Sequence, residues 1–194
     1  MDEEALPFET PAAFEAWLDE HHEASDGIWI KFAKKASGIQ SVTYKQVLPV
    51  ALAYGWIDGQ VKRIDDDWYR QRWTPRRARS VWSKINRAAA EAMIERGEMK
   101  PAGLREVERA KADGRWERAY DSPTTATVPD ELQAALDRDP AAAKFFAELD
   151  SNNRYAILHR IQNAKRPETR ARRIAQFVAM CSRGETVHPR RDAR

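Results

Sequence analysis

Apolar and polar positions near the start of the chain predict one helix and one strand. Thr10 followed by Pro11 is typical of a helix N-terminus, and apolar side chains then recur at helical spacing as far as about His22. The run IWIKFA at 28–33 is short and rich in β-branched and aromatic residues. Those two properties favour a strand over a helix.

A second helix is predicted after the polar stretch that follows this strand. Thr43 and Gln46 form a capping-box pattern, and Gly55 supplies a typical helix stop. Pro49 lies inside this helix beyond the first turn, where a proline removes a backbone hydrogen bond at a cost of about 3 kcal/mol. We therefore expect a kink at Pro49.

From residue 56 onward, apolar and polar residues alternate with a period of two residues. The alternating runs 56–64 and 68–73 flank a short acidic turn at 65–67. Two alternating runs around a tight polar turn predict an antiparallel β-hairpin. Thr74 and Pro75 are expected to end its second strand, because proline cannot continue a hydrogen-bonded ladder.

Two more helices are predicted before residue 120. Ser83 is placed to cap the first, which ends at Gly97, and Pro101 starts the second, which ends at Gly114. The side chains expected along one side of the first helix are Ile85, Ala89, Ala92, Met93 and Arg96. The apolar stripe expected on the second helix is Leu104, Val107 and Ala110.

A stretch rich in proline, serine and threonine at 121–129 lacks periodicity and is typical of a linker. Beyond it the pattern predicts four helices joined by short loops. We therefore expect an α+β fold in which residues 1–120 form a small antiparallel sheet with a β-hairpin packed by helices. Residues 121–186 form an all-helical subdomain in this prediction, and the polar tail at 187–194 is expected to be disordered.

Composition indicates a folded, soluble protein. Of 194 residues, 42% are hydrophobic and 32% charged, and no stretch approaches the roughly 20 apolar residues that a membrane-spanning helix needs. The single cysteine, Cys181, excludes a disulfide framework and fits a reducing compartment. Because the first residues show no basic flank followed by an apolar run, we expect a cytoplasmic protein without a membrane span.

The net charge of +3 conceals a strong polarity along the chain. Residues 1–67 hold six basic and 13 acidic side chains, a net charge of −7, which leaves 27 basic and 17 acidic side chains, a net of +10, in the remainder. Within that remainder, residues 68–90 contain seven basic side chains and no acidic one, and residues 152–183 contain eight basic side chains and one acidic one. Two separate basic tracts indicate local anion sites more than a whole-molecule attraction to nucleic acid.

The first tract predicts an anion-binding pocket. Guanidinium groups suit a bidentate grip on carboxylate or phosphate, and the helix N-terminus that follows the tract adds backbone N–H donors. The residues expected to form this pocket are Trp56, Asp58, Arg72, Trp73, Arg76, Arg77, Ser83 and Asn86. The competing interpretation is an internal network of salt bridges with the acidic side chains of the hairpin.

The second tract, at 165–173, predicts another anion-binding corner. Pro167 as the first helical residue places Arg170 in the first turn, at the positive end of the helix dipole, with Lys165 just before it. An anion there would relieve the unfavourable charge. The competing interpretation is a solvated basic helix face.

Asp58 is the best single candidate for catalysis, because Gly59 beside it allows a ligand to approach closely. A carboxylate next to arginines is expected to have a lowered pKa and to be a weak general base. The chain has no metal-ligand spacing of histidines and cysteines and no phosphate-cradling glycine loop. Cys181 falls on an apolar helix stripe, so a buried thiol is favoured over a nucleophile, and we expect no cofactor or metal.

Several blocks of sequence resemble the bacterial YdeI/OmpD-associated (OmdA) family. They are GWIDGQ at 55–60, RWTPRR with SVWSKIN at 72–86, GEMKPAG at 97–103, and the C-terminal helical module around Tyr155 and 164–174. The resemblance runs from about Phe8 to His188 and implies a small cytoplasmic protein of bacteriocin protection or antimicrobial stress response. It supplies no catalytic residues. The family's signature residues coincide with the two basic tracts at Asp58, Arg72, Arg76, Arg77, Ser83, Asn86, Lys165 and Arg170.

Three functional hypotheses follow. The leading one is a non-enzymatic stress or antimicrobial-protection protein that binds an anionic small molecule or an acidic peptide through an arginine-rich pocket. The second is a nucleic-acid-binding protein, because aromatic residues alternate with arginines between Trp68 and Trp82. The third is an enzyme that uses Asp58 with arginines, although no pair of nucleophile and base is visible. The identity of the ligand and the oligomeric state are left open.

Overall fold

The computed structural model describes residues 4–189 of the chain. It divides into two compact units, Met1–Ala119 and Tyr120–Arg194, which are described in turn. Among the described residues, no helix combines the length and the apolar character needed to cross a membrane.

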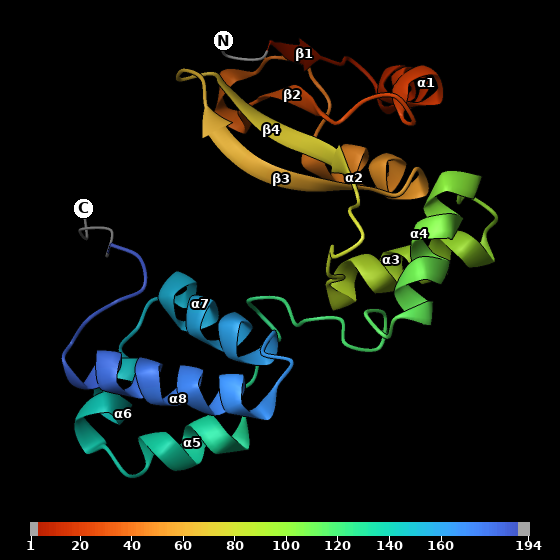
Figure 1. Ribbon diagram of the computed structural model, residues 1–194. Helices are drawn as coiled ribbons and strands as arrows, with labels where there is room; N and C mark the ends of the chain where they lie inside the picture. The colour runs from red at the N-terminus through yellow and green to blue at the C-terminus, as the bar shows by residue number, and fades with distance from the viewer. Residues whose placement is uncertain (1–3, 190–194) are drawn as a thin grey trace. The chain divides into compact units, whose positions relative to one another are not determined.

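The first unit is built on a four-stranded mixed sheet with the strand order β1-β2-β4-β3 (Figure 1). Its strands are β1 (Ala5–Pro7), β2 (Ile28–Ala33), β3 (Trp56–Arg63) and β4 (Trp68–Pro75). The hairpin β3–β4 and the pairing of β2 with β4 are antiparallel. The α+β class is therefore confirmed, but the sheet is not wholly antiparallel, because the short strand β1, which the sequence pattern did not predict, pairs in parallel with β2.

The helices of the first unit are α1 (Pro11–His21), the short 3-10 helix η1 (Lys35–Ser37), α2 (Tyr44–Ala53), α3 (Lys84–Glu95) and α4 (Pro101–Ala112). The predicted N-caps are present: the Thr10 hydroxyl accepts a hydrogen bond from the backbone of Ala13 at 3.2 Å. At the start of α2, Gln46 Oε1 accepts a hydrogen bond from the Thr43 backbone N–H at 2.9 Å. Helix α2 continues through Pro49, and the kink there stays a prediction.

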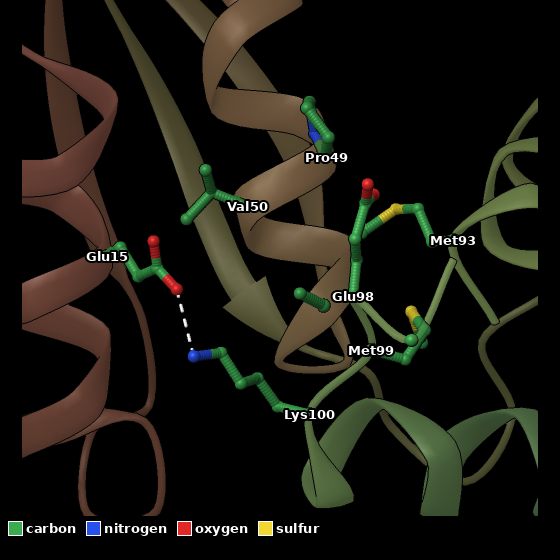
Figure 2. Close-up of a pocket in the computed structure, with 9 residues that line it drawn as sticks. Glu15, Pro49, Val50, Met93, Glu98, Met99 and Lys100 are labelled. Carbon is green, nitrogen blue, oxygen red and sulfur yellow. Dashed lines mark ion pairs between the residues drawn. The ribbon is translucent and has the colours of Figure 1, made fainter. Parts of the chain in front are cut away.

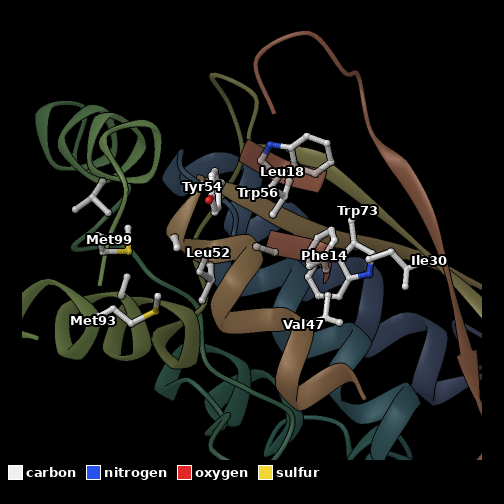
Figure 3. Close-up of a cluster of buried hydrophobic side chains, with 14 of the residues drawn as sticks. Phe14, Leu18, Ile30, Val47, Leu52, Tyr54, Trp56, Trp73, Met93 and Met99 are labelled. Carbon is white, nitrogen blue, oxygen red and sulfur yellow. The ribbon is translucent and has the colours of Figure 1, made fainter. Parts of the chain in front are cut away.

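The core of the first unit lies on one face of the sheet. Phe14 and Leu18 of α1 and Val47 of α2 pack there with inward-facing strand residues such as Ile30 and Trp73 (Figure 3). Because side chains alternate along a strand, the other face presents a separate set of side chains, which do not belong to this core.

The buried side of α3 differs from the prediction. Met93 is buried as expected, but Ile85 is 56% exposed, and the other buried positions are Asn86 and Ala90, each one residue beyond an expected position. On α4, Val107 and Ala110 are buried as expected, but Leu104 is 38% exposed. The hydrophobic periodicity predicted both helices correctly but placed part of their buried faces wrongly. Several of these positions carry alanine or a long side chain, which tolerates either a buried or an exposed environment.

Helix α4 approaches the end of α2 more closely than any side chain would allow. A Cβ atom on Gly103 would lie 2.2 Å from the backbone oxygen of Ala53. The same oxygen accepts a hydrogen bond from the Lys100 N–H at 3.1 Å. The end of α2 and the glycine-containing segment 97–103 are therefore in direct backbone contact.

The second unit is a helical bundle with its own core. Its helices are α5 (Asp130–Leu136), α6 (Pro140–Ala147), α7 (Ser151–Gln162) and α8 (Pro167–Ser182). Helix α8 packs against the other three, and Leu132, Phe146, Ile157 and Phe177 are among the buried residues that they share. Residues 121–129 contain turns and no helix or strand. Of the tail expected to be disordered, 187–194, residues 190–194 lie outside the described residues.

Gly103→Ala is predicted to destabilise the first unit by about 1–3 kcal/mol, because the added methyl group overlaps the Ala53 carbonyl. Alanine is otherwise the better helix former, so helix propensity alone predicts the opposite sign. All seven tryptophans precede residue 120, so urea unfolding followed by tryptophan fluorescence reports on this unit.

Gly59→Ala is the matched control for this substitution. Its Cβ would lie at an ordinary 3.5 Å from the nearest atom, so its effect should stay within about 0.5 kcal/mol. Equal stability of the Gly103→Ala variant and the wild type would show that the junction is not tight.

Candidate functional site

The predicted pocket residues of the hairpin divide between the two faces of the sheet. The register pairs Asp58 with Trp73 and Arg72 with Trp29, so Asp58 and Trp73 point to the helix-covered face and Arg72 to the other. Trp56 and Trp73 belong to the buried core. Strand alternation therefore does not place Arg72 and Asp58 around one cavity.

Asp58 lies among polar groups at the edge of the core. Its carboxylate accepts a hydrogen bond from Gln71 Nε2 at 3.1 Å and another from the Tyr44 side chain. Burial raises the pKa of Asp58 above its ordinary value, and these hydrogen bonds and the charge of Arg76 oppose the rise only in part. The expectation of a lowered pKa was wrong, since loss of hydration outweighs the nearby arginine.

Arg76 is held inside the protein. Its guanidinium carbon lies 3.6 Å from the centre of the Trp82 ring, and Nη1 donates a hydrogen bond to the Val81 carbonyl at 3.1 Å. Arg77, the next residue, is exposed, and its backbone N–H donates to the Ser80 hydroxyl. Neighbouring arginines of the same tract thus have opposite environments.

Ser83 and Asn86 have a local role at the start of α3. The Ser83 hydroxyl accepts a hydrogen bond from the Asn86 backbone N–H at 3.1 Å, which is the N-cap that the sequence predicted. The Asn86 side chain is buried on the inner side of the helix.

Arg76, a predicted pocket residue, lies near Glu106 on α4 together with three arginines that the sequence patterns did not single out. Arg76, Arg105, Arg109 and Arg115 all act on the Glu106 carboxylate, yet burial raises its pKa above the ordinary value. A surface pocket of about 300 Å³ beside it is lined by Trp56, Pro75, Arg76, Arg105 and Glu106, among others. Only the packing of α4 against the hairpin brings Trp56 and Arg76 to Glu106, so spacing along the sequence did not predict this pocket.

Three of the arginines that act on Glu106 have carboxylate partners within the chain, and of these three Arg105 lines the pocket. Arg105 pairs with Glu23 at 3.2 Å, Arg109 pairs with Glu106, and Arg115 pairs with Asp113 at 2.7 Å. A pocket whose cations are neutralised internally has little need of an external anion.

The other sheet face gathers cations around a tryptophan. Lys62 of β3 and Arg70 and Arg72 of β4 lie over the Trp29 ring, at 5.1, 4.8 and 6.0 Å from its centre. Trp29 is only 8% exposed although it does not belong to the core cluster, so the stems of these basic side chains cover it. Lys31 of β2 points to the same side, 4.2 Å from the Trp68 ring. We call these four residues, Lys31, Lys62, Arg70 and Arg72, the basic face.

Several acidic side chains of the first unit lie outside this face. Glu15 and Asp19 are on α1, Asp58 points to the core side, and 65–67 form the hairpin turn. Among the described strand residues whose register places them on the basic face, none is acidic.

In the second unit, the predicted anion corner is partly occupied by the chain itself. Arg170 forms a bidentate pair with Glu131, at 3.2 and 3.1 Å, and also donates to the Ile161 carbonyl at 3.3 Å. Lys165 is exposed. Arg170 thus bridges α5, α7 and α8 within the chain, which differs from the solvated helix face of the competing interpretation.

A further pocket of about 390 Å³ lies between α1, α2 and the loop before α4 (Figure 2). Met93 and Met99 line it, and the ion pair between Lys100 Nζ and Glu15 at 2.9 Å spans it. Glu15 and Tyr54 raise the pKa of Lys100 well above its usual range, and burial with the Asp19 hydrogen bond raises the pKa of Tyr54 to about 12. A lysine held in its charged form is no nucleophile.

Two other kinds of chemistry find no support in the described part of the chain. Residues 4–189 contain no group of three or more His, Cys, Asp or Glu side chains placed to hold a metal ion. Burial raises the pKa of the Cys181 thiol, which makes it a poorer nucleophile.

The raised pKa of Asp58 predicts the sign of a pH effect on stability. The folded chain binds this proton more tightly than the unfolded chain, whose carboxyl titrates near 3.8, so the stabilisation is complete below that pH and is lost as the pH rises through the folded-state pKa. The free energy of unfolding of the wild type, compared with that of Asp58→Asn, should therefore fall as the pH rises through the folded-state pKa of Asp58. Urea unfolding at a series of pH values measures it, and the opposite slope would show a lowered pKa.

Comparison with protein families assigns each unit separately. Residues 6–106, more than half of the chain, match a family described as a domain of unknown function (DUF8412). Residues 125–184 match the family described as bacteriocin-protection, YdeI or OmpD-associated, so this model covers the second unit and not the whole span that the resemblance suggested. Searches of curated proteins and of solved structures gave no match. The chain thus belongs to the DUF8412 family through its sheet-containing unit and carries a YdeI/OmpD-associated, bacteriocin-protection domain in its helical unit.

Proposed function

We propose that this chain is a non-enzymatic, bacteriocin-protection-related protein that binds an anionic partner on its basic face. One observation carries the proposal: four cations from three adjacent strands point to one side of the sheet, and no described strand residue on that side is acidic. Lysine and arginine side chains gathered in this way raise the local concentration of anions.

The magnitude of surface electrostatics favours a partner with several negative charges. One exposed ion pair contributes at most about 1 kcal/mol, so a small monoanion would bind weakly. A multivalent anion that contacts several cations of the basic face at once adds these small contributions together. The pocket beside Glu106 is the weaker candidate, because two carboxylates, Glu23 and Glu106, line it and Glu23 is paired with Arg105.

Binding is favoured over catalysis for the first unit. Lys100 is held as a cation by Glu15, and Asp58 is enclosed by hydrogen bonds from Gln71 and Tyr44. Neither arrangement offers an activated nucleophile next to a base.

Inorganic polyphosphate and poly-glutamate are the probes that test this proposal. The full chain should bind at least one of them by isothermal titration calorimetry, with an affinity that falls as salt is added. The double variant Lys62→Gln with Arg72→Gln should bind roughly fivefold more weakly, because two ion pairs of about 0.5 kcal/mol each are lost.

The control is Lys45→Gln, which removes one positive charge from the exposed side of α2, away from the basic face. It should bind like the wild type. No binding of either polymer at low salt, or the same loss in the control as in the double variant, would contradict the proposal.

A further inference from the structure

The basic face carries two indole side chains as well as its cations. Trp29 lies on β2, and Trp68 lies on β4 opposite Ala33 of the neighbouring strand. The Trp68 side chain is partly exposed, with Lys31 Nζ above its ring. Aromatic and basic side chains of two adjacent strands thus share one face of the sheet. They are Trp29 and Lys31 on β2, and Trp68, Arg70 and Arg72 on β4.

This combination suits one kind of polyanion better than the others. An acidic peptide or polyphosphate would use the cations and leave the indoles without a role. A single-stranded nucleic acid offers phosphates to the cations and unpaired bases to stack on the partly exposed Trp68 indole and on planar guanidinium groups. A duplex hides the faces of its bases in the helical stack.

The surroundings of the face define the extent of such a site. The acidic hairpin turn at 65–67 lies at one end of the basic face. The Asp65 carboxylate in this turn interacts electrostatically with Lys31 and Lys34. A phosphate is therefore repelled at the turn.

We propose that the basic face binds single-stranded nucleic acid, with phosphates held by Lys31, Lys62, Arg70 and Arg72 and a base stacked on Trp68. This inference rests on the proposed function, because it names the anionic partner of the same surface. The pocket beside Glu106 takes no part in it.

Fluorescence anisotropy with the full chain and a labelled oligo-thymidylate tests the inference. The strand should exceed the roughly 4–16 nucleotides that one compact nucleic-acid-binding fold occupies. Binding should weaken with salt, and the slope of log K against log salt should approach about −3 if all four cations neutralise phosphates. Arg70→Gln should make this slope shallower by about 0.7, whereas Lys45→Gln should leave it unchanged.

Trp68→Leu separates stacking from simple charge attraction. It keeps every cation, and loss of one stacked base should weaken oligo-thymidylate binding at least fivefold, while polyphosphate binding stays at the wild-type level. Circular dichroism and a thermal melt establish that the variant is folded. A second variant at the same position, Trp68→Phe, keeps an aromatic ring and should recover part of the affinity.

The outcomes distinguish the two proposals. Polyphosphate binding without oligo-thymidylate binding would overturn the inference and leave the proposed function standing, and failure of every polyanion would overturn both. Equal binding of a duplex of the same length, or no effect of Trp68→Leu, would show a general polyanion surface and would also overturn the inference.

Discussion

The close contact between α4 and the end of α2 is the constraint on which the first unit depends. The Ala53 carbonyl accepts the Lys100 N–H, and Gly103 passes so near to the same oxygen that no side chain fits. Two residues after Ala53, the Gly55 carbonyl accepts a hydrogen bond from the Arg76 N–H at 2.9 Å. This bond holds the end of β4 next to the contact between α2 and α4. Helices α2 and α4 and the hairpin are therefore fixed relative to one another by a few backbone groups, which leave no room for adjustment.

This packing decides how the positive charge of the unit is used. Arginines that α4 and the hairpin enclose, such as Arg76 and Arg115, are covered by Trp82 or paired with Asp113, because a buried cation without a partner is costly. On the opposite side of the sheet, Lys62 and Arg70 lie over the Trp29 ring. Basic side chains thus have a structural role on the helix-covered side and form the proposed binding surface on the other.

Sequence patterns predicted most elements and failed where packing decides. The hairpin, the N-caps at Thr10 and Ser83 and the four C-terminal helices are confirmed, because turn chemistry and periodicity are local properties. Strand β1 was missed because its three residues form a strand only beside β2. The pocket beside Glu106 was missed because Trp56 and Arg76 meet α4 only in the folded chain.

By itself, the sequence determined the α+β class, the YdeI/OmpD-associated character of the second unit and the presence of a basic tract rich in tryptophan. Only the tertiary structure decided that Arg72 and Asp58 lie on opposite sides of one sheet, and that Arg170 is paired with Glu131. The physical reason is that composition and periodicity record which side chains are present and how they alternate. Which side meets a carboxylate and which meets solvent depends on the helices that cover one face of the sheet.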